Sequence, residues 1–295
     1  MMIISTIQKF SLFLLSFCRL SLTHKLATIL SVIFLSKKSK KYSVSCKNLK
    51  ACYPEQPQDW IEEKAKKSLI EYAKAMIEAP FIYRQAEKNL DKLIENVHSE
   101  NLIKEAIEEN KGVIFMTPHH GSWEMSGLYA ASKIKTFTMY KPLRNKILDD
   151  FVFKGRETKG SSLVETDNSG VKKLLKALRE NYGVGILPDH TPKINQGVMS
   201  TFFGVPVNTT TLIYKLSRKN KIPIIYLFAE RLNNGKGFDI HVGRVEEEFY
   251  KLDEKEAADF LNHIIEILVN KNVYQYLWSY ERFRNRSEVN ESIYN

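Results

Sequence analysis

Apolar residues recur at helical spacing in the front part of the chain and gather in short runs in the remainder. Residues 60–79 and 101–109 carry apolar side chains three and four positions apart with charged residues between them, which predicts amphipathic helices. From residue 112 onward, short runs rich in β-branched and aromatic residues alternate with helical patterns. The pattern therefore predicts a helical front portion followed by alternating strands and helices.

This alternation defines a series of predicted elements. Strands are expected at residues 113–116, 136–139, 163–165, 184–187, 223–229 and 238–242, and helices at 123–132, 146–158, 171–181, 209–219 and 254–270. Strands that alternate with helices at this spacing form a sheet covered by helices. We therefore expect an α/β fold, with a mixed sheet flanked by helices, an N-terminal membrane-attached helix and a helical segment packed on the sheet.

The N-terminal segment differs from the rest in charge and hydropathy. Residues 1–50 hold nine Lys or Arg and no Asp or Glu, so the remaining chain carries only +1 of the formal net charge of +10. Two apolar runs, residues 10–18 and 26–35, are separated by charged residues, and neither reaches the roughly 20 residues of a membrane-spanning helix. Whether it forms one tilted helix or two pieces lying in the interface, this segment is predicted to attach the protein to a membrane.

Basic residues follow the apolar runs, from Lys37 to Lys50. By the positive-inside tendency, they predict that the body of the protein lies in the cytoplasm. A cleaved signal peptide is a third option for the N-terminus, but no small-x-small cleavage site follows Leu35. Because the basic residues are concentrated here and not spread over a folded domain, they favour an anionic membrane surface over nucleic acid.

Four segments follow from these patterns. Residues 1–40 are expected to form the membrane anchor or interfacial segment, residues 41–110 a helical segment packed on the catalytic domain, and residues 111–285 the α/β domain. Residues 286–295 are polar and are expected to form a tail without a role.

The most informative stretch follows the first strand of the α/β portion. Residues 117–124 read Thr-Pro-His-His-Gly-Ser-Trp-Glu, at a strand's carboxyl end, where such sheets gather their functional groups. A turn at Gly121 and a helix beginning near Trp123 would swing Glu124 back toward the imidazole of His119. His119 is then a candidate general base, made more basic by Glu124, that takes a proton from an alcohol attacking a thioester. A structural histidine is the alternative.

Spacing alone does not identify this site. His241 and Glu246 repeat the five-residue separation of His119 and Glu124. His241 alternates with apolar residues in the predicted strand 238–242 and is most simply a strand residue.

Other kinds of chemistry have little support in the sequence. There is no glycine-rich phosphate loop of the GxGxxG or GxxxxGK[ST] type and no GxSxG elbow, which argues against a nucleotide enzyme and against a serine acyl-enzyme. Cys18, Cys46 and Cys52 form no CxxC pair and have no histidine at a metal-ligand spacing. No metal site, disulfide framework or cofactor is therefore predicted.

Several blocks together resemble one known family. Residues 118–124 are similar to the His-x4-Asp/Glu motif of the lysophospholipid acyltransferase superfamily, in the form typical of the late acyltransferases of lipid A biosynthesis, the lauroyl and myristoyl type. Further similar blocks follow in the family's order: Asn48 to Glu55, Tyr140-Lys141-Pro142 with Asn145, Gly155-Arg156-Glu157, Pro188-Asp189, Phe202-Phe203-Gly204 with Thr209, and Gln275 to Trp278 with Arg282-Phe283. The resemblance covers nearly the whole chain. One departure is His190, because the family commonly has Gln after this Asp.

The resemblance implies a fold, a reaction and partners. It implies that a fatty acyl chain moves from acyl carrier protein to a hydroxyl of a lipid A precursor at the bacterial inner membrane, without a cofactor or a covalent acyl-enzyme. His119 would be the general base and Glu124 its partner. Arg156 would help to hold a phosphate or stabilise oxyanion charge. Asp189 would bind substrate, with a turn or helix-cap carboxylate as the alternative.

Two alternatives to this function remain open at the level of sequence. The first is an acyltransferase of the same superfamily that acts on another glycolipid or lysolipid acceptor. The second is a membrane-tethered scaffold without activity, which the retention of both His119 and Glu124 speaks against.

Overall fold

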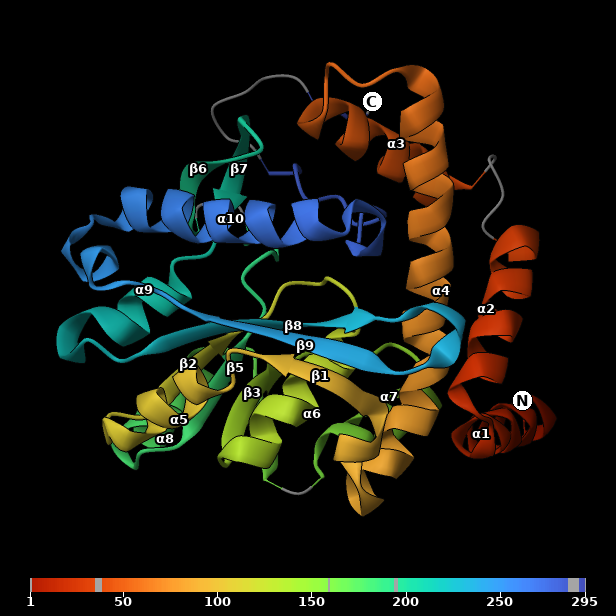
Figure 1. Ribbon diagram of the computed structural model, residues 1–295, viewed down its shortest axis with the longest axis horizontal. Coiled ribbons are helices and arrows are strands. Elements are labelled where there is room, and N and C mark those ends of the chain that lie inside the picture. The colour runs from red at the N-terminus through yellow and green to blue at the C-terminus, as the bar shows by residue number, and fades with distance from the viewer. Residues whose placement is uncertain (1, 35–38, 159, 194–195, 286–291, 295) are drawn as a thin grey trace.

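The structure is a computed structural model that describes residues 2–34, 39–158, 160–193, 196–285 and 292–294 (Figure 1). Lys37 and Lys38 of the predicted basic cluster, and most of the predicted polar tail, lie outside the described residues.

Within the described residues, seven strands form one mixed sheet in the order β1-β9-β8-β2-β5-β3-β4. Neighbouring strands from β8 to β4 are parallel, β9 is antiparallel to β8, and β1 is parallel to β9. The strands are β1 (Ile94–His98), β2 (Val113–Met116), β3 (Thr136–Tyr140), β4 (Ser161–Glu165), β5 (Gly183–Ile186), β8 (Ile224–Arg231) and β9 (Phe238–Arg244). The carboxyl ends of the five parallel strands from β8 to β4 therefore meet at one edge.

Helices cover both faces of the sheet, and the alternation of side chains along β2 shows why. Val113 and Phe115 belong to the core shared with α5 (Asn101–Glu108) and α6 (Trp123–Lys133). Ile114 and Met116 point the other way, into the core shared with α8 (Asn168–Arg179), α9 (Leu212–Ser217) and α10 (Glu254–Lys271). The predicted α/β fold, a mixed sheet flanked by helices, is confirmed.

Three features of the sheet and its surroundings differ from the prediction. The edge strand β1 lies in residues 41–110, which were predicted to be helical, and the hairpin of β6 (Val198–Phe202) and β7 (Val205–Thr209) that packs against α10 was not predicted. The helix predicted at 209–219 begins only at Leu212, because Thr209 is the last residue of β7.

A single long helix, α4 (Gln58–Lys88), connects the two cores. Its 31 residues extend about 46 Å, so its first half packs in one core through Ile61 and Leu69 and its second half in the other through Ile82 and Tyr83. The apolar spacing predicts a helix only as far as Ala79, and α4 continues through Pro80, which lacks the N–H that a helix interior needs. The helix continues because the burial of Ile82 and Tyr83 outweighs that one missing hydrogen bond.

The N-terminal segment forms two helices, α1 (Met2–Phe17) and α2 (Leu20–Phe34), which both pack against α4, and α3 (Lys40–Cys52) packs there as well (Figure 1). Of the two arrangements expected from the sequence, the structure has the two separate pieces. Among the helices that the structure describes, none is long and apolar enough to span a membrane.

A buried cluster of charges joins the helical portion to the sheet. Arg231, at the end of β8, has a side chain that is only 1% exposed and donates hydrogen bonds to Glu71 and Glu78 of α4. His24 of α2 lies 2.7 Å from the same Glu78 carboxylate. Arg231 also donates to the carbonyl oxygen of Gly121 at 3.2 Å, so the cluster reaches the loop that follows β2.

This cluster predicts a loss of stability in acid. Burial opposes ionisation of Glu78, but Arg231 and His24 outweigh it and lower its pKa to about 2. Because the folded-state pKa is depressed, the stabilisation is complete above the unfolded value near 4.5 and is lost as the pH falls toward 2. We expect Glu78 to contribute on the order of 3 kcal/mol to the fall in the free energy of unfolding over that interval, measured in urea titrations as the difference between the unsubstituted protein and Glu78→Gln.

Glu78→Gln should remove most of this pH dependence and lower the stability at neutral pH, because it leaves Arg231 short of one carboxylate. Glu63→Gln is the matched control, since Glu63 pairs with Lys67 on the exposed side of α4. A Glu78→Gln profile parallel to that of the unsubstituted protein between pH 5 and 2 would contradict the assignment.

Candidate active site

The loop between β2 and α6 has a backbone shape that requires glycine at one position. Gly121 has φ of +61°, and a Cβ there would lie 2.1 Å from the carbonyl oxygen of Ala229 in β8. The backbone N–H groups of Gly121 and Ser122 donate to the carbonyls of Gln275 and Ala229. The loop is thus held between β8 and the C-terminal segment, and it ends where α6 begins at Trp123.

His119 lies in this loop and is oriented by Asp189. Its Nδ1 is 2.9 Å from Asp189 Oδ1, and its backbone N–H donates to Asp189 Oδ2 at 2.8 Å. Asp189 follows β5, which pairs directly with β2, so sheet order brings together residues 70 positions apart. Because an ionised carboxylate only accepts hydrogen bonds, Nδ1 carries the proton and Nε2 is left as the basic nitrogen.

The charge of Asp189 is stabilised by this contact. Burial alone would raise the pKa of its carboxyl, but the interaction with His119 outweighs it and holds the pKa well below the ordinary value. Asp189 therefore stays ionised in the pH range where enzymes work. Asp189 lies in the turn that follows β5, and both of its oxygens bind His119 instead of capping a helix.

Glu124 has different partners from those expected. Its carboxylate accepts hydrogen bonds from Nε and Nη2 of Arg156, at the end of α7 (Lys146–Arg156), and from the hydroxyl of Tyr83 at 2.7 Å. Burial opposes ionisation of Glu124, but the Arg156 guanidinium outweighs it and lowers its pKa. Within the described residues no hydrogen bond joins His119 to Glu124, so the expected contact between them is wrong. From the first turn of α6, the Glu124 side chain turns toward α7 and α4 instead of back over the loop.

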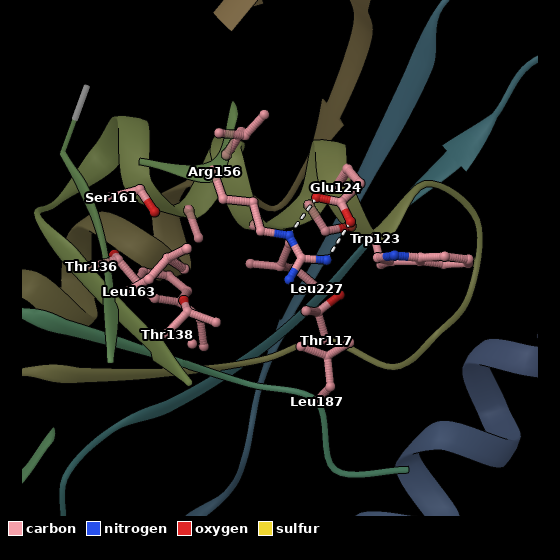
Figure 2. Close-up of a pocket in the computed structure, with 16 residues that line it drawn as sticks. Thr117, Trp123, Glu124, Thr136, Thr138, Arg156, Ser161, Leu163, Leu187 and Leu227 are labelled. Atoms are coloured by element: carbon pink, nitrogen blue, oxygen red, sulfur yellow. Dashed lines mark hydrogen bonds and ion pairs between the residues drawn. The ribbon is translucent and has the colours of Figure 1, made fainter. Parts of the chain in front are cut away.

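The four predicted site residues therefore form two pairs, His119 with Asp189 and Glu124 with Arg156. Trp123 lies between His119 and Glu124 in the sequence, and its ring contacts that of His119 at a centroid distance of 5.4 Å. Trp123, Glu124 and Arg156 all line the same pocket, and Figure 2 shows these three residues at one end of it.

This pocket lies between α6 and the sheet. It encloses about 610 Å³ of space free of protein atoms, open solvent at its mouth included. Apart from the residues at the charged end, its lining is apolar or small: Phe115, Gly127, Leu128, Ala130, Thr136, Thr138, Ser161, Leu163, Gly185, Leu187 and Leu227. A Cβ at Gly127 would meet no atom within 4 Å, so helix α6 leaves room at this point. Such a lining suits a hydrocarbon chain.

Sequence reasoning missed Tyr83, which holds Glu124 and lies beyond the predicted end of its helix at Ala79. The block that contains Arg156 held one signal for Tyr83, the residue Gly155. A Cβ at Gly155 would lie 2.1 Å from the Tyr83 ring, so the glycine permits this close packing of α7 on α4.

Other residues of the similar blocks lie in the core. Phe202 and Trp278 are 1% exposed and pack with Tyr276, away from the lining of the pocket. His120 is buried, and this lowers its pKa to about 3 and keeps its ring neutral. His241, the second histidine with an acid five positions on, is a residue of β9 that bonds to Glu230 and not to Glu246.

Comparisons with known proteins point to one family. The family model described as bacterial lipid A biosynthesis acyltransferase matches residues 4–285. The lipid A biosynthesis palmitoleoyltransferase of Escherichia coli (strain K12) is 25% identical over 256 residues, which cover 86% of this chain and 82% of that protein. A lipid A biosynthesis acyltransferase of Haemophilus influenzae is 27% identical over 291 residues, 97% of this chain and 88% of that protein. The E. coli lipid A biosynthesis lauroyltransferase is 22% identical over 266 residues, 90% of this chain and 85% of that protein.

Proposed function

The chain belongs to the bacterial lipid A biosynthesis acyltransferases, and from this premise we propose that it transfers a fatty acyl chain from acyl carrier protein to a hydroxyl of a lipid A precursor. Acyl transfer in lipid A biosynthesis follows from the family, whereas the donor and the mechanism are the proposal. The observation that carries the proposal is a histidine, fixed by a buried carboxylate, beside the charged end of an apolar pocket.

His119 is the general base of the proposed mechanism. Its Nε2 takes the proton of the acceptor hydroxyl, while Asp189 holds Nδ1–H and stabilises the imidazolium that forms. The acceptor oxygen attacks the thioester carbonyl and forms the new ester bond. The carbon–sulfur bond breaks, and the leaving thiolate takes the proton from His119. The acyl group never becomes attached to the enzyme.

Glu124 acts through Arg156 in this proposal. The two hydrogen bonds from Arg156 to Glu124 use Nε and Nη2, and Nη1 has no hydrogen bond to the described residues. A guanidinium fixed in this way presents its remaining N–H groups to a phosphate of the acceptor or to the oxyanion of the transition state.

The acyl chain lies along the strands in this proposal. The pocket reaches from Leu187 to Thr136 and Ser161, which are in register with Gly183. Four strand residues cover about 13 Å. The pocket also crosses from β5 to β3 and β4, so its length exceeds this spacing along the strands.

Mass spectrometry of lipid A tests the function and the base together. A cell that lacks its own late acyltransferase is complemented with this chain, with His119→Ala, or with His98→Ala as the control, since His98 is an exposed residue of β1. The unsubstituted chain and His98→Ala should add one acyl mass, and His119→Ala should add none.

An expressed, folded chain that adds no mass to lipid A would favour the alternative glycolipid or lysolipid acceptor, or a scaffold without activity. An equal added mass with His119→Ala would contradict the general base.

A second experiment identifies the partner of the histidine. In Asp189→Asn the amide oxygen accepts from the His119 backbone N–H, so the amide NH2 donates to Nδ1 and the ring proton moves to Nε2. We expect kcat to fall by about 10³- to 10⁴-fold with little change in KM, and ¹⁵N NMR should report the changed tautomer. Glu124→Gln should leave the tautomer unchanged. A tautomer that changes in Glu124→Gln but not in Asp189→Asn would make Glu124 the partner after all.

Acyl carrier protein is proposed as the donor because of basic residues around the start and along the length of α7. Lys141, Arg144, Lys146 and Lys154 are all exposed, and acyl carrier protein is acidic. Added salt should raise the KM for the donor, and a KM independent of salt would exclude this docking surface.

The proposed location is the cytoplasmic side of the bacterial inner membrane. An exposed apolar stripe on α1, made of Ile7, Phe10, Phe13, Leu14 and Phe17, supports this location. Exposed Lys9, Arg19 and Lys25 flank the apolar residues of α1 and α2, so an anionic bilayer suits both kinds of side chain.

The protein should sediment with vesicles that contain anionic lipid. The double substitution Phe10→Glu and Phe13→Glu should abolish this sedimentation.

A further inference from the structure

Thr117 has a buried hydroxyl without a partner. The residue follows β2, is 5% exposed, and its Oγ1 makes no hydrogen bond within the part of the chain that the structure describes. Burying a hydroxyl without a partner is unfavourable, and valine would fill the same space without that cost. Packing alone therefore gives no reason for a hydroxyl at this position.

The position of Thr117 indicates what the hydroxyl is for. Seven described residues carry buried polar side-chain atoms without a partner, and Thr117 alone among them lines the pocket. In Figure 2 the Thr117 hydroxyl points toward the side of the pocket where Arg156 meets Glu124. Thr117 is also two positions before His119 in the same loop.

The backbone holds Thr117 in place. Its N–H donates to the carbonyl oxygen of Ile186 in β5 at 3.1 Å, and the residue after it is Pro118. A hydroxyl on a fixed backbone needs little reorganisation when charge develops beside it, which is the requirement for electrostatic stabilisation of a transition state.

We propose that the Thr117 hydroxyl donates a hydrogen bond to the carbonyl oxygen of the acyl thioester and strengthens it as that oxygen becomes an oxyanion. This inference rests on the proposed acyl transfer. The Thr117 proton stays on its own oxygen throughout, because His119 carries the proton that is transferred. Arg156 Nη1, at the same end of the pocket, is the charged donor to the same region.

Steady-state kinetics with acyl carrier protein donor and a lipid A precursor test this role. Thr117→Val keeps the shape of the side chain and removes the hydroxyl, and Thr117→Ser keeps the hydroxyl. For Thr117→Val we expect kcat to fall by about tenfold to a hundredfold with the donor KM within about twofold. Thr117→Ser should restore kcat to within about threefold of the unsubstituted enzyme. Thr210→Val is the control, because that hydroxyl lies in the loop before α9, outside the pocket.

The outcomes separate this inference from the proposed function. An active enzyme in which Thr117→Val has an unchanged kcat overturns the role of Thr117 and leaves the proposed function intact. The inference also fails if Thr117→Ser is as slow as Thr117→Val, since the loss would then come from packing. If the unsubstituted enzyme transfers no acyl group to the precursor, the proposed function and this inference fail together.

Discussion

The arrangement of this protein depends on one buried cation, Arg231. Its side chain is 1% exposed, and a guanidinium is stable at such a position only if its donors are satisfied by nearby acceptors. Glu78 of α4 supplies the carboxylate, His24 ties α2 to that carboxylate, and the carbonyl of Gly121 accepts from the same guanidinium. The interaction that docks the helical portion on the sheet therefore also fixes the turn that presents His119.

Two further carboxylates have separate partners in the site. Asp189 and Glu124 are both buried, and each remains ionised because a cationic or hydrogen-bonding partner outweighs the cost of burial. Asp189 binds Nδ1 of His119, whereas Glu124 binds Nε and Nη2 of Arg156. Under the proposed function, one pair handles the proton of the acceptor and the other handles negative charge, so neither has to change role during the reaction.

Sequence patterns predicted the fold better than the pairing of the site residues. The strand before His119 and the helix after it were predicted to within one residue, because runs and periodicities are local properties. The pairing of His119 with Asp189 was not predicted. It depends on the adjacency of β2 and β5, and local spacing along the chain does not determine the order of strands in a sheet. Arg231 gave no signal either, since a charged residue at a strand end reads as exposed until α4 is packed over it.

The orientation of the pocket connects the fold to the choice of acyl chain. The pocket lies between α6 and the five parallel strands, with lining residues on β8, β2, β5, β3 and β4. Its width is set by small side chains such as Gly127 on α6 and Gly185 on β5. Where the Gly127 Cβ would stand there is open space, so alanine fits here without disturbing the neighbouring atoms. Under the proposed function, related enzymes with this fold can therefore differ in acyl chain through residues on α6 while the two ion-paired carboxylates stay in place.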